Sequence, residues 1–220
     1  MNCVTVVCTV HEEFGLANPS ELCAILERIR PEVIFLEVPP AAFDDYYVVC
    51  RQRNLESKAV RTYRLRAQVQ LVPVDLPTPE GEFFENFEYL RTRIREVSLE
   101  YRQLVDQDRA YVGRYGFAYL NSDYSSTFWT DLYGEMLNAL GNLGDPRLVD
   151  IYESWTATNN LRDIAMITNI QNYCSDHSFN GGVFLVGAAH RQSIIDKSQG
   201  TTLQLVPDWV FRNPQSEQRS

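Results

Sequence analysis

Residues 183–194 read VFLVGAAHRQSI, an apolar run that stops at Gly-Ala-Ala-His and continues into a helical pattern. An apolar run of this length after a glycine pair is typical of a buried strand in a parallel sheet. His190, one of only three histidines in the chain, therefore stands directly after a buried strand. In open α/β sheets, ligands bind beyond the carboxyl ends of the strands. This stretch thus predicts both the fold class and the place of a site.

The same order of strand and helix recurs before and after this stretch. A helix is expected after Asn18, which can cap it, with Pro19 at its first position and Pro31 as its stop. Each crossover is long enough to join parallel strands. We therefore expect one α/β domain over residues 1–220, with a mostly parallel sheet covered by helices on both faces. The predicted strands are 3–10, 32–38, 69–75, 183–188 and 202–206, and the predicted flanking helices begin at 19, 55 and 191.

The middle of the chain, residues 79–157, is expected to be a helical insert between core segments 1–78 and 158–210. The apolar residues from Phe83 to Leu104 repeat at spacings of three and four, which predicts one long helix from Pro79 to about Ala110. The aromatic-rich segment 111–133 is broken up by Gly, Asn and Ser and is expected to be loop or short helix. Further helices are predicted at 131–140, 146–155 and 159–175, and a frayed tail at 211–220.

Composition narrows the classes of function. The net charge of −9 disfavours binding to nucleic acid, because it repels phosphate backbones. No apolar run approaches the ~20 residues that cross a membrane, and the N-terminus does not have the features of a signal peptide. Five widely spaced cysteines without a C-x-x-C pair favour reduced thiols and a cytoplasmic location. The expected partner is a small-molecule or peptide substrate, and the oligomeric state is left open.

Polar side chains stand at four predicted strand ends: His11, Glu37, Asp75 and His190. Two imidazoles and one carboxylate form the ligand set of many hydrolytic metal sites, which leave one position for water. Glu37 lies within the apolar string IFLEVP, so its burial requires a metal ion, a cation or several donors.

Each of these residues also has a structural interpretation. Each histidine can be a hydrogen-bonded structural residue, and Glu37 can be one half of a buried ion pair. For Asp75 a turn cap is the favoured interpretation. Cys8 is expected to be a small buried residue whose side chain points away from the face that carries His11.

These motifs also resemble those of the Tiki/TraB/erythromycin-esterase/ChaN-like superfamily. The string GAAH at 187–190 is similar to that family's second G-x-x-H motif, RPEVIFLEVPP to the segment that carries its glutamate, and NNLRDIAMITNI to the helix before its last motif. The first motif has Cys8 where the family usually has glycine. The resemblance covers about 1–40 and 158–197. It implies an α/β fold whose pocket is built from both histidines and the glutamate, as in metal-dependent peptidases, esterases that open macrolide lactones, and haem-binding members.

The resulting expectation is a hydrolase of an amide or ester bond. His11, Glu37 and His190 would bind a divalent metal ion that activates water, or a histidine or Glu37 would act as general base. Arg162 would stabilise the oxyanion or orient a substrate carboxylate, and Asp163 would orient a histidine; the alternative is that the two form only an exposed pair on a helix.

Two further alternatives concern the pocket. The aromatic segment 111–133 would line it, or would only pack the insert on the sheet. The same pocket could instead bind haem or another flat ligand without turnover, or belong to a degenerate regulatory member of the superfamily.

Overall fold

The computed structural model describes residues 2–77, 79, 81–199 and 208–210. Its described residues form a five-stranded sheet with the order β3-β2-β4-β1-β5, in which every neighbouring pair is parallel. This confirms the predicted α/β fold with a parallel central sheet. The predicted strand at 202–206 lies outside the described residues. On the side of β1 away from β4, the described strand is Asp208–Val210. The strands are β1 Cys3–Thr9, β2 Val33–Leu36, β3 Gln70–Pro73, β4 Gly182–Gly187 and β5 Asp208–Val210.

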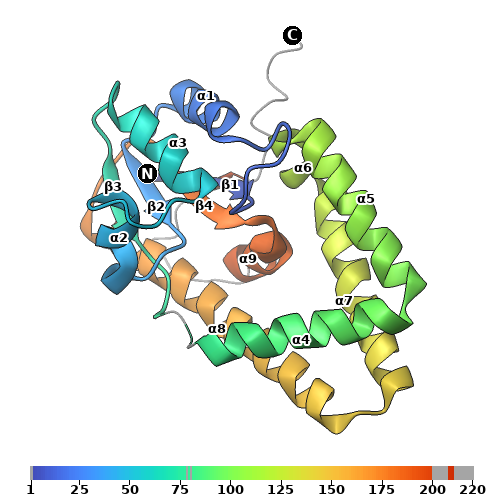
Figure 1. Cartoon of the computed structure of the whole chain (residues 1–220). Coiled ribbons are helices and arrows are strands. Elements are labelled where there is room, and N and C mark those ends of the chain that lie inside the picture. Colours follow the sequence, from blue (N-terminus) through green and yellow to red (C-terminus); the bar gives the residue numbers. More distant parts are fainter. Residues whose placement is uncertain (1, 78, 80, 200–207, 211–220) are drawn as a thin grey trace.

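Helices cover both faces of the sheet (Figure 1). The helices α1 and α3 pack together on one face, and α8 and α9 lie together on the other, as right-handed crossovers between parallel strands require. As predicted, Asn18 caps α1 by accepting a hydrogen bond from the backbone of Glu21, and Pro19 starts the helix. These elements are α1 Pro19–Ile29, α2 Phe43–Tyr47, α3 Leu55–Arg64, α8 Pro146–Asp176 and α9 Arg191–Gln199, with 3-10 helices η1 Pro40–Ala42 and η2 Ala188–His190.

The insert is a frame of long helices beside the sheet (Figure 1). It consists of α4 Gly81–Val97, α5 Leu99–Tyr115, α6 Phe117–Leu120, α7 Asp123–Leu143 and the first half of α8. A second apolar core, separate from the core around the sheet, holds these helices together and contains Leu90, Ile94, Met136, Leu140 and Leu148. In the described part of the chain, no helix combines the length and the apolar character that a bilayer crossing needs.

The predicted long helix from 79 to 110 is wrong, because the chain forms two helices there. Ser98 lies between α4 and α5, and its hydroxyl accepts a hydrogen bond from the backbone N–H of Tyr101 while donating to Glu135. A serine in this role is a helix N-cap, so it starts a new helix within a continuous apolar period.

The segment 111–133, expected to be loop or short helix, is mostly helical. It comprises the end of α5, all of α6 and the start of α7. Gly116, with φ of 51°, ends α5, and Ser122 caps α7. The predicted breakers therefore mark only the boundaries between helices.

The predicted helices 146–155 and 159–175 form the single 31-residue helix α8. Thr156 and Asn159 lie where the two predicted helices meet, and their side chains bond to their own helix. The Thr156 hydroxyl donates to the Tyr152 carbonyl at 3.0 Å, and the Asn159 amide donates to the Trp155 carbonyl at 3.1 Å. These bonds leave the backbone helical, so α8 continues from the insert to the sheet without interruption.

A buried asparagine joins the insert to the sheet. Among the described residues β5 pairs with β1 only as far as Thr5, so the outer edge of β1 at Cys8 has no strand beside it. The side-chain amide of Asn121 takes the place of a strand: it accepts from the Cys8 N–H at 2.7 Å and donates to the Cys8 carbonyl at 3.1 Å. One side chain thus satisfies both backbone groups of a buried residue.

Replacement of Asn121 by alanine should destabilise the fold. The substitution leaves the N–H and the carbonyl of Cys8 buried without partners, each at a cost of about 1–3 kcal/mol. We expect the free energy of unfolding to fall by about 2–4 kcal/mol, measured by urea denaturation. Asn138→Ala, at an exposed position of α7, is the control and should change it by less than about 0.5 kcal/mol. Equal unfolding midpoints for the two variants would contradict this role.

Candidate functional site

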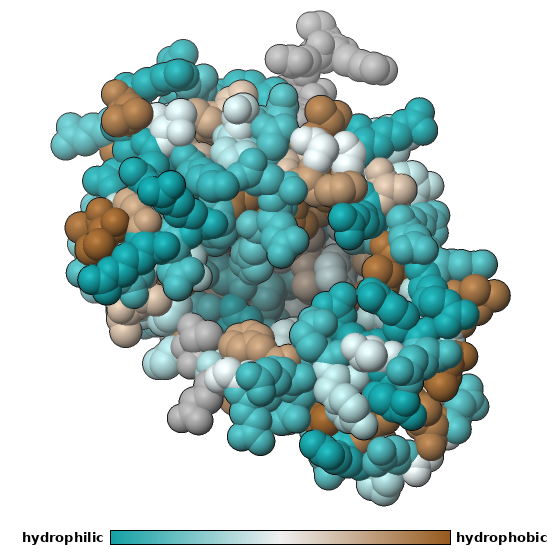
Figure 2. Space-filling model, in the orientation of Figure 1, coloured by the Kyte–Doolittle hydropathy of each residue, from teal (hydrophilic) through white to brown (hydrophobic). Residues whose placement is uncertain are grey.

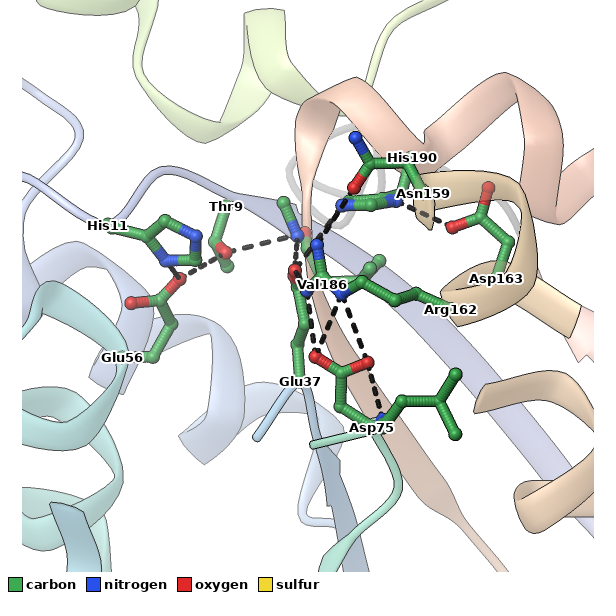
Figure 3. A network of polar contacts seen from close by, with 12 residues as sticks. Thr9, His11, Glu37, Glu56, Asp75, Asn159, Arg162, Asp163, Val186 and His190 are labelled. Atoms are coloured by element: carbon green, nitrogen blue, oxygen red, sulfur yellow. Dashed lines mark hydrogen bonds and ion pairs between the residues drawn. The ribbon is translucent and has the colours of Figure 1, made fainter. Parts of the chain in front are cut away.

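The carboxyl ends of the strands meet at one edge of the sheet, beside a cavity of about 830 Å3. Thr9 at the end of β1 is in register with Gly187 at the end of β4, and β2 and β3 end beside them. The five residues that the sequence proposed for a site all line this cavity: His11, Glu37, Arg162, Asp163 and His190. Figure 3 shows them as parts of one polar network.

Glu37 is the centre of that network. Its side chain is only 7% exposed, and both carboxylate oxygens have donors. Oε1 accepts from the Arg162 guanidinium at 2.7 Å and lies 3.3 Å from Nε2 of His190, while Oε2 accepts from the backbone N–H of Gly187 at 2.6 Å. Burial alone would raise the pKa of Glu37, but the neighbouring His190, His11 and Arg162 outweigh it and hold the pKa well below its usual range. Glu37 is therefore a buried carboxylate in its charged form.

Arg162 binds two carboxylates at once. Its Nε lies 3.2 Å from both oxygens of Asp75, and its terminal nitrogen Nη2 donates to Asp75 Oδ2 at 2.7 Å and to Glu37 Oε1. Its other terminal nitrogen, Nη1, donates to Asn159 at 2.9 Å. The favoured interpretation of Asp75 as a turn cap is incomplete: it does accept from the N–H of Leu76, but its main partner is this guanidinium.

Arg162 and Asp163 were expected in the first turn of a helix, which is wrong, because they lie in the middle of the continuous helix α8. They still reach the site, since α8 passes the carboxyl edge of the sheet at this point (Figure 3). Neither residue belongs to an exposed surface pair: Asp163 is 3% exposed, and the side chain of Arg162 is 19% exposed.

His190 is held between two carboxylates. Its Nδ1 donates to Asp163 at 2.6 Å, and its Nε2 faces Glu37. Burial would lower the pKa of the imidazole, but the charge of Glu37 and the hydrogen bonds to Asp163 and Glu37 raise it to about 10. His190 is consequently a cation at neutral pH, in an orientation that Asp163 fixes.

His11 has a carboxylate partner that could not be predicted from the sequence. Its Nδ1 lies 3.1 Å from Oε1 of Glu56, and the same oxygen accepts from the Thr9 hydroxyl at 2.6 Å. Glu56 is 6% exposed and belongs to the first turn of α3, behind the cap at Asn54. The signal in the sequence was an acidic residue directly after Leu55, at the start of a helix that packs on the sheet.

The second ring nitrogen of His11, Nε2, has no hydrogen-bond partner in the described part of the chain. The side chain is 61% exposed and lines the cavity. The hydrogen bond to Glu56 raises the pKa of His11 to about 9, against a smaller opposing effect of burial. His11 therefore presents one free nitrogen to the cavity, while the other is fixed by Glu56.

The arrangement does not fit a metal ion bound by His11, Glu37 and His190. Both oxygens of Glu37 and both nitrogens of His190 already have protein partners, and one of these partners is the cationic Arg162. Among the described residues, no group of three or more His, Cys, Asp or Glu side chains is placed to hold a metal ion. The metal ion stays a prediction, for which metal analysis is the test.

The wall of the cavity opposite the polar network is aromatic. Trp129 and Tyr133 of α7 line it together with Phe87 of α4 and Trp155 of α8. The rings of Phe87 and Trp155 stack with centroids 3.6 Å apart and an interplanar angle of 3°. The segment 111–133 therefore contributes to both of its expected roles, because Trp129 lines the cavity while Phe117 is buried in the core around the sheet.

No family model, curated protein or solved structure matches this chain. The superfamily resemblance therefore stays a prediction.

Proposed function

We propose that this protein hydrolyses an ester or amide bond, with His11 and His190 as the reacting groups. The proposal rests on one observation: two imidazoles, each fixed at Nδ1 by a buried carboxylate, line the same cavity. Carboxylate–imidazole pairs of this kind orient a histidine for proton transfer at its other nitrogen. Glu56 does this for His11, and Asp163 does it for His190.

The free Nε2 of His11 suits a general base. In its neutral form it takes a proton from a water molecule, whose oxygen attacks the carbonyl carbon of the substrate. The His190 imidazolium, whose Nε2 faces Glu37, lies at the same cavity, and its positive charge stabilises the oxyanion that develops. When the tetrahedral intermediate collapses, His11 returns the proton to the leaving alcohol or amine, and a carboxylic acid is released. Glu37 keeps His190 charged, and Asp163 fixes its orientation.

Turnover on a panel of uncharged esters and amides tests this function. His11→Ala should lower kcat/KM by about 10²–10⁴-fold, the usual contribution of one acid–base group. His177→Ala is the matched control, because His177 is exposed and does not line the cavity. Equal turnover of these two variants would contradict the role of His11. A metal analysis and a chelator assay belong to the same experiment, since retained activity without metal is expected.

The pH dependence follows from the two imidazole pKa values. Because His11 has to lose its proton to act as base, kcat/KM should rise about tenfold per pH unit and level off near pH 9. Above about pH 10 it should fall, because His190 loses its proton. Glu56→Gln removes the main cause of the raised pKa of His11, so the rising limb should move to lower pH. A flat profile between pH 6 and 9, or a limb that does not move, would contradict this assignment.

A second candidate function is binding of a flat ligand without turnover, which the aromatic wall favours. Ligand binding without hydrolysis of any ester or amide in the panel would establish it in place of the first. A cytoplasmic location and the absence of nucleic-acid partners remain predictions from composition; the five free cysteines agree with reducing surroundings.

A further inference from the structure

We infer that the cavity selects an uncharged substrate with a flat aromatic group, which lies against Trp129, Tyr133 and Trp155 while the ester or amide lies at His11 and His190. This inference rests on the proposed function for the reacting end of the substrate. The recognition of the aromatic group is a separate claim, which a binding experiment tests without turnover.

Charge pairing in the cavity argues for an uncharged substrate. Arg162 is neutralised by Glu37 and Asp75, and His190 lies between two carboxylates. On the insert side, Arg91 pairs with Glu88 at 2.7 Å. An anionic group would find each of these cations already paired, and the net charge of −9 would repel it. Burial of an unpaired charge is costly, so neither sign of charge is favoured inside.

The aromatic wall argues for a flat group. The indole nitrogen of Trp155 donates to the Tyr133 hydroxyl at 3.5 Å, and the rings of Tyr133 and Trp129 lie with centroids 6.1 Å apart. These three side chains therefore form one continuous lining, backed by the stack of Phe87 on Trp155. Offset or edge-to-face contacts between two aromatic rings add interaction energy to that gained by burying apolar surface.

The spacing along α8 sets the size of the group. Trp155 and Arg162 are seven residues apart on one helix, which places them on the same face and about 10 Å apart along the axis. Both line the cavity, Trp155 at the aromatic wall and Arg162 in the polar network. This separation suits a two-ring aromatic group joined directly to an ester or amide.

The space-filling view agrees with this arrangement. Figure 2 shows a hollow between the part of the molecule built around the sheet and the lobe of insert helices. Hydrophilic residues border much of this hollow, and the side chains of Trp129, Tyr133 and Trp155 line the cavity. A flat apolar group would leave water on entering, which is the main source of affinity for such pockets.

Isothermal titration calorimetry with uncharged ketones measures recognition apart from hydrolysis, because a ketone has no leaving group. We expect 2-acetylnaphthalene to bind at least about tenfold more tightly than 2-octanone, and the same naphthyl ketone bearing a carboxylate or a quaternary ammonium group to bind more weakly. Trp129→Leu should weaken binding of 2-acetylnaphthalene about 3- to 10-fold. Tyr124→Leu, an exposed position of the same helix outside the cavity, is the control and should leave it unchanged.

Trp155→Phe provides a second variant that keeps a ring at the stack with Phe87. It should weaken binding less than Trp129→Leu does, with an unfolding midpoint close to that of the wild type. The inference would be overturned if 2-octanone bound as tightly as 2-acetylnaphthalene, or if either charged naphthyl ketone bound more tightly than the uncharged one. A titration of His11→Ala separates the two proposals, because this variant should still bind 2-acetylnaphthalene. If the wild type binds the naphthyl ketone but hydrolyses no ester or amide, only the hydrolase function fails.

Discussion

Glu37→Gln should lower kcat/KM by about 10³-fold while the protein still folds, because the variant loses the charge that keeps His190 protonated. Glu37 accepts from Arg162 and Gly187 and faces His190, and a glutamine has only one oxygen for these donors. The free energy of unfolding should fall by about 1–3 kcal/mol, the cost of one mismatched buried donor. The pKa of His190, measured by NMR titration of its ring, should fall from about 10 toward its usual value.

A purely structural role for Glu37 would predict a different result. It would lower stability but leave turnover of the remaining folded protein unchanged. Glu32→Gln is the matched control, since Glu32 lies just before β2 at the opposite edge of the sheet and is exposed. An unmoved pKa of His190 in Glu37→Gln would contradict the electrostatic coupling between the two residues.

Arg162→Met should be the most destabilising of the substitutions considered. The methionine keeps part of the volume but leaves Glu37 and Asp75 buried without their shared cation. Breaking a buried pair from one side typically costs about 3–5 kcal/mol, because an uncompensated charge stays inside. We expect a fall of this size in the free energy of unfolding at pH 7, measured by urea denaturation, and loss of hydrolysis.

The pH dependence of this loss tests its cause. In the wild type the pKa of Glu37 is lower in the folded than in the unfolded state. Its contribution to stability is therefore present above the unfolded pKa of about 4.3 and disappears as the pH falls. The stability difference between Arg162→Met and the wild type should accordingly stay nearly constant from pH 7 to about pH 5 and shrink as the pH falls below about 4. Arg147→Met, at an exposed position in the first turn of α8, is the control and should show neither effect.

The sequence was most informative about the sheet. Buried strands gave continuous apolar runs, and the parallel order followed from the long crossovers, so the strand ends and His11, Glu37 and His190 could be placed at one edge. Helix boundaries in the insert could not be predicted, because they depend on capping hydrogen bonds and not on the apolar period. Ser98 caps a new helix within one continuous apolar period, whereas the Thr156 hydroxyl bonds within α8 and does not interrupt it.

For two members of the site, Glu56 and Asp75, the charged partner could not be predicted, for a different reason. Glu56 and Asp75 are ordinary acidic residues whose sequence neighbours do not reveal their partners. Asp75 pairs with Arg162 across 87 positions of the chain, and Glu56 with His11 across 45. Only the packing of α3 and α8 on the sheet brings these groups together, so the pairing is a property of the tertiary fold.

The continuity of α8 constrains how the insert can change in length. One helix carries both Trp155 of the aromatic wall and Arg162 of the polar network, and an α-helix turns by about 100° per residue. The addition of a single residue between them would therefore turn the indole away from the cavity. An addition of seven residues would restore the phase and move the wall outward by about 10 Å. Related chains with larger ligands should therefore differ here by whole pairs of helical turns, and a redesign of the cavity for a longer substrate can use the same step.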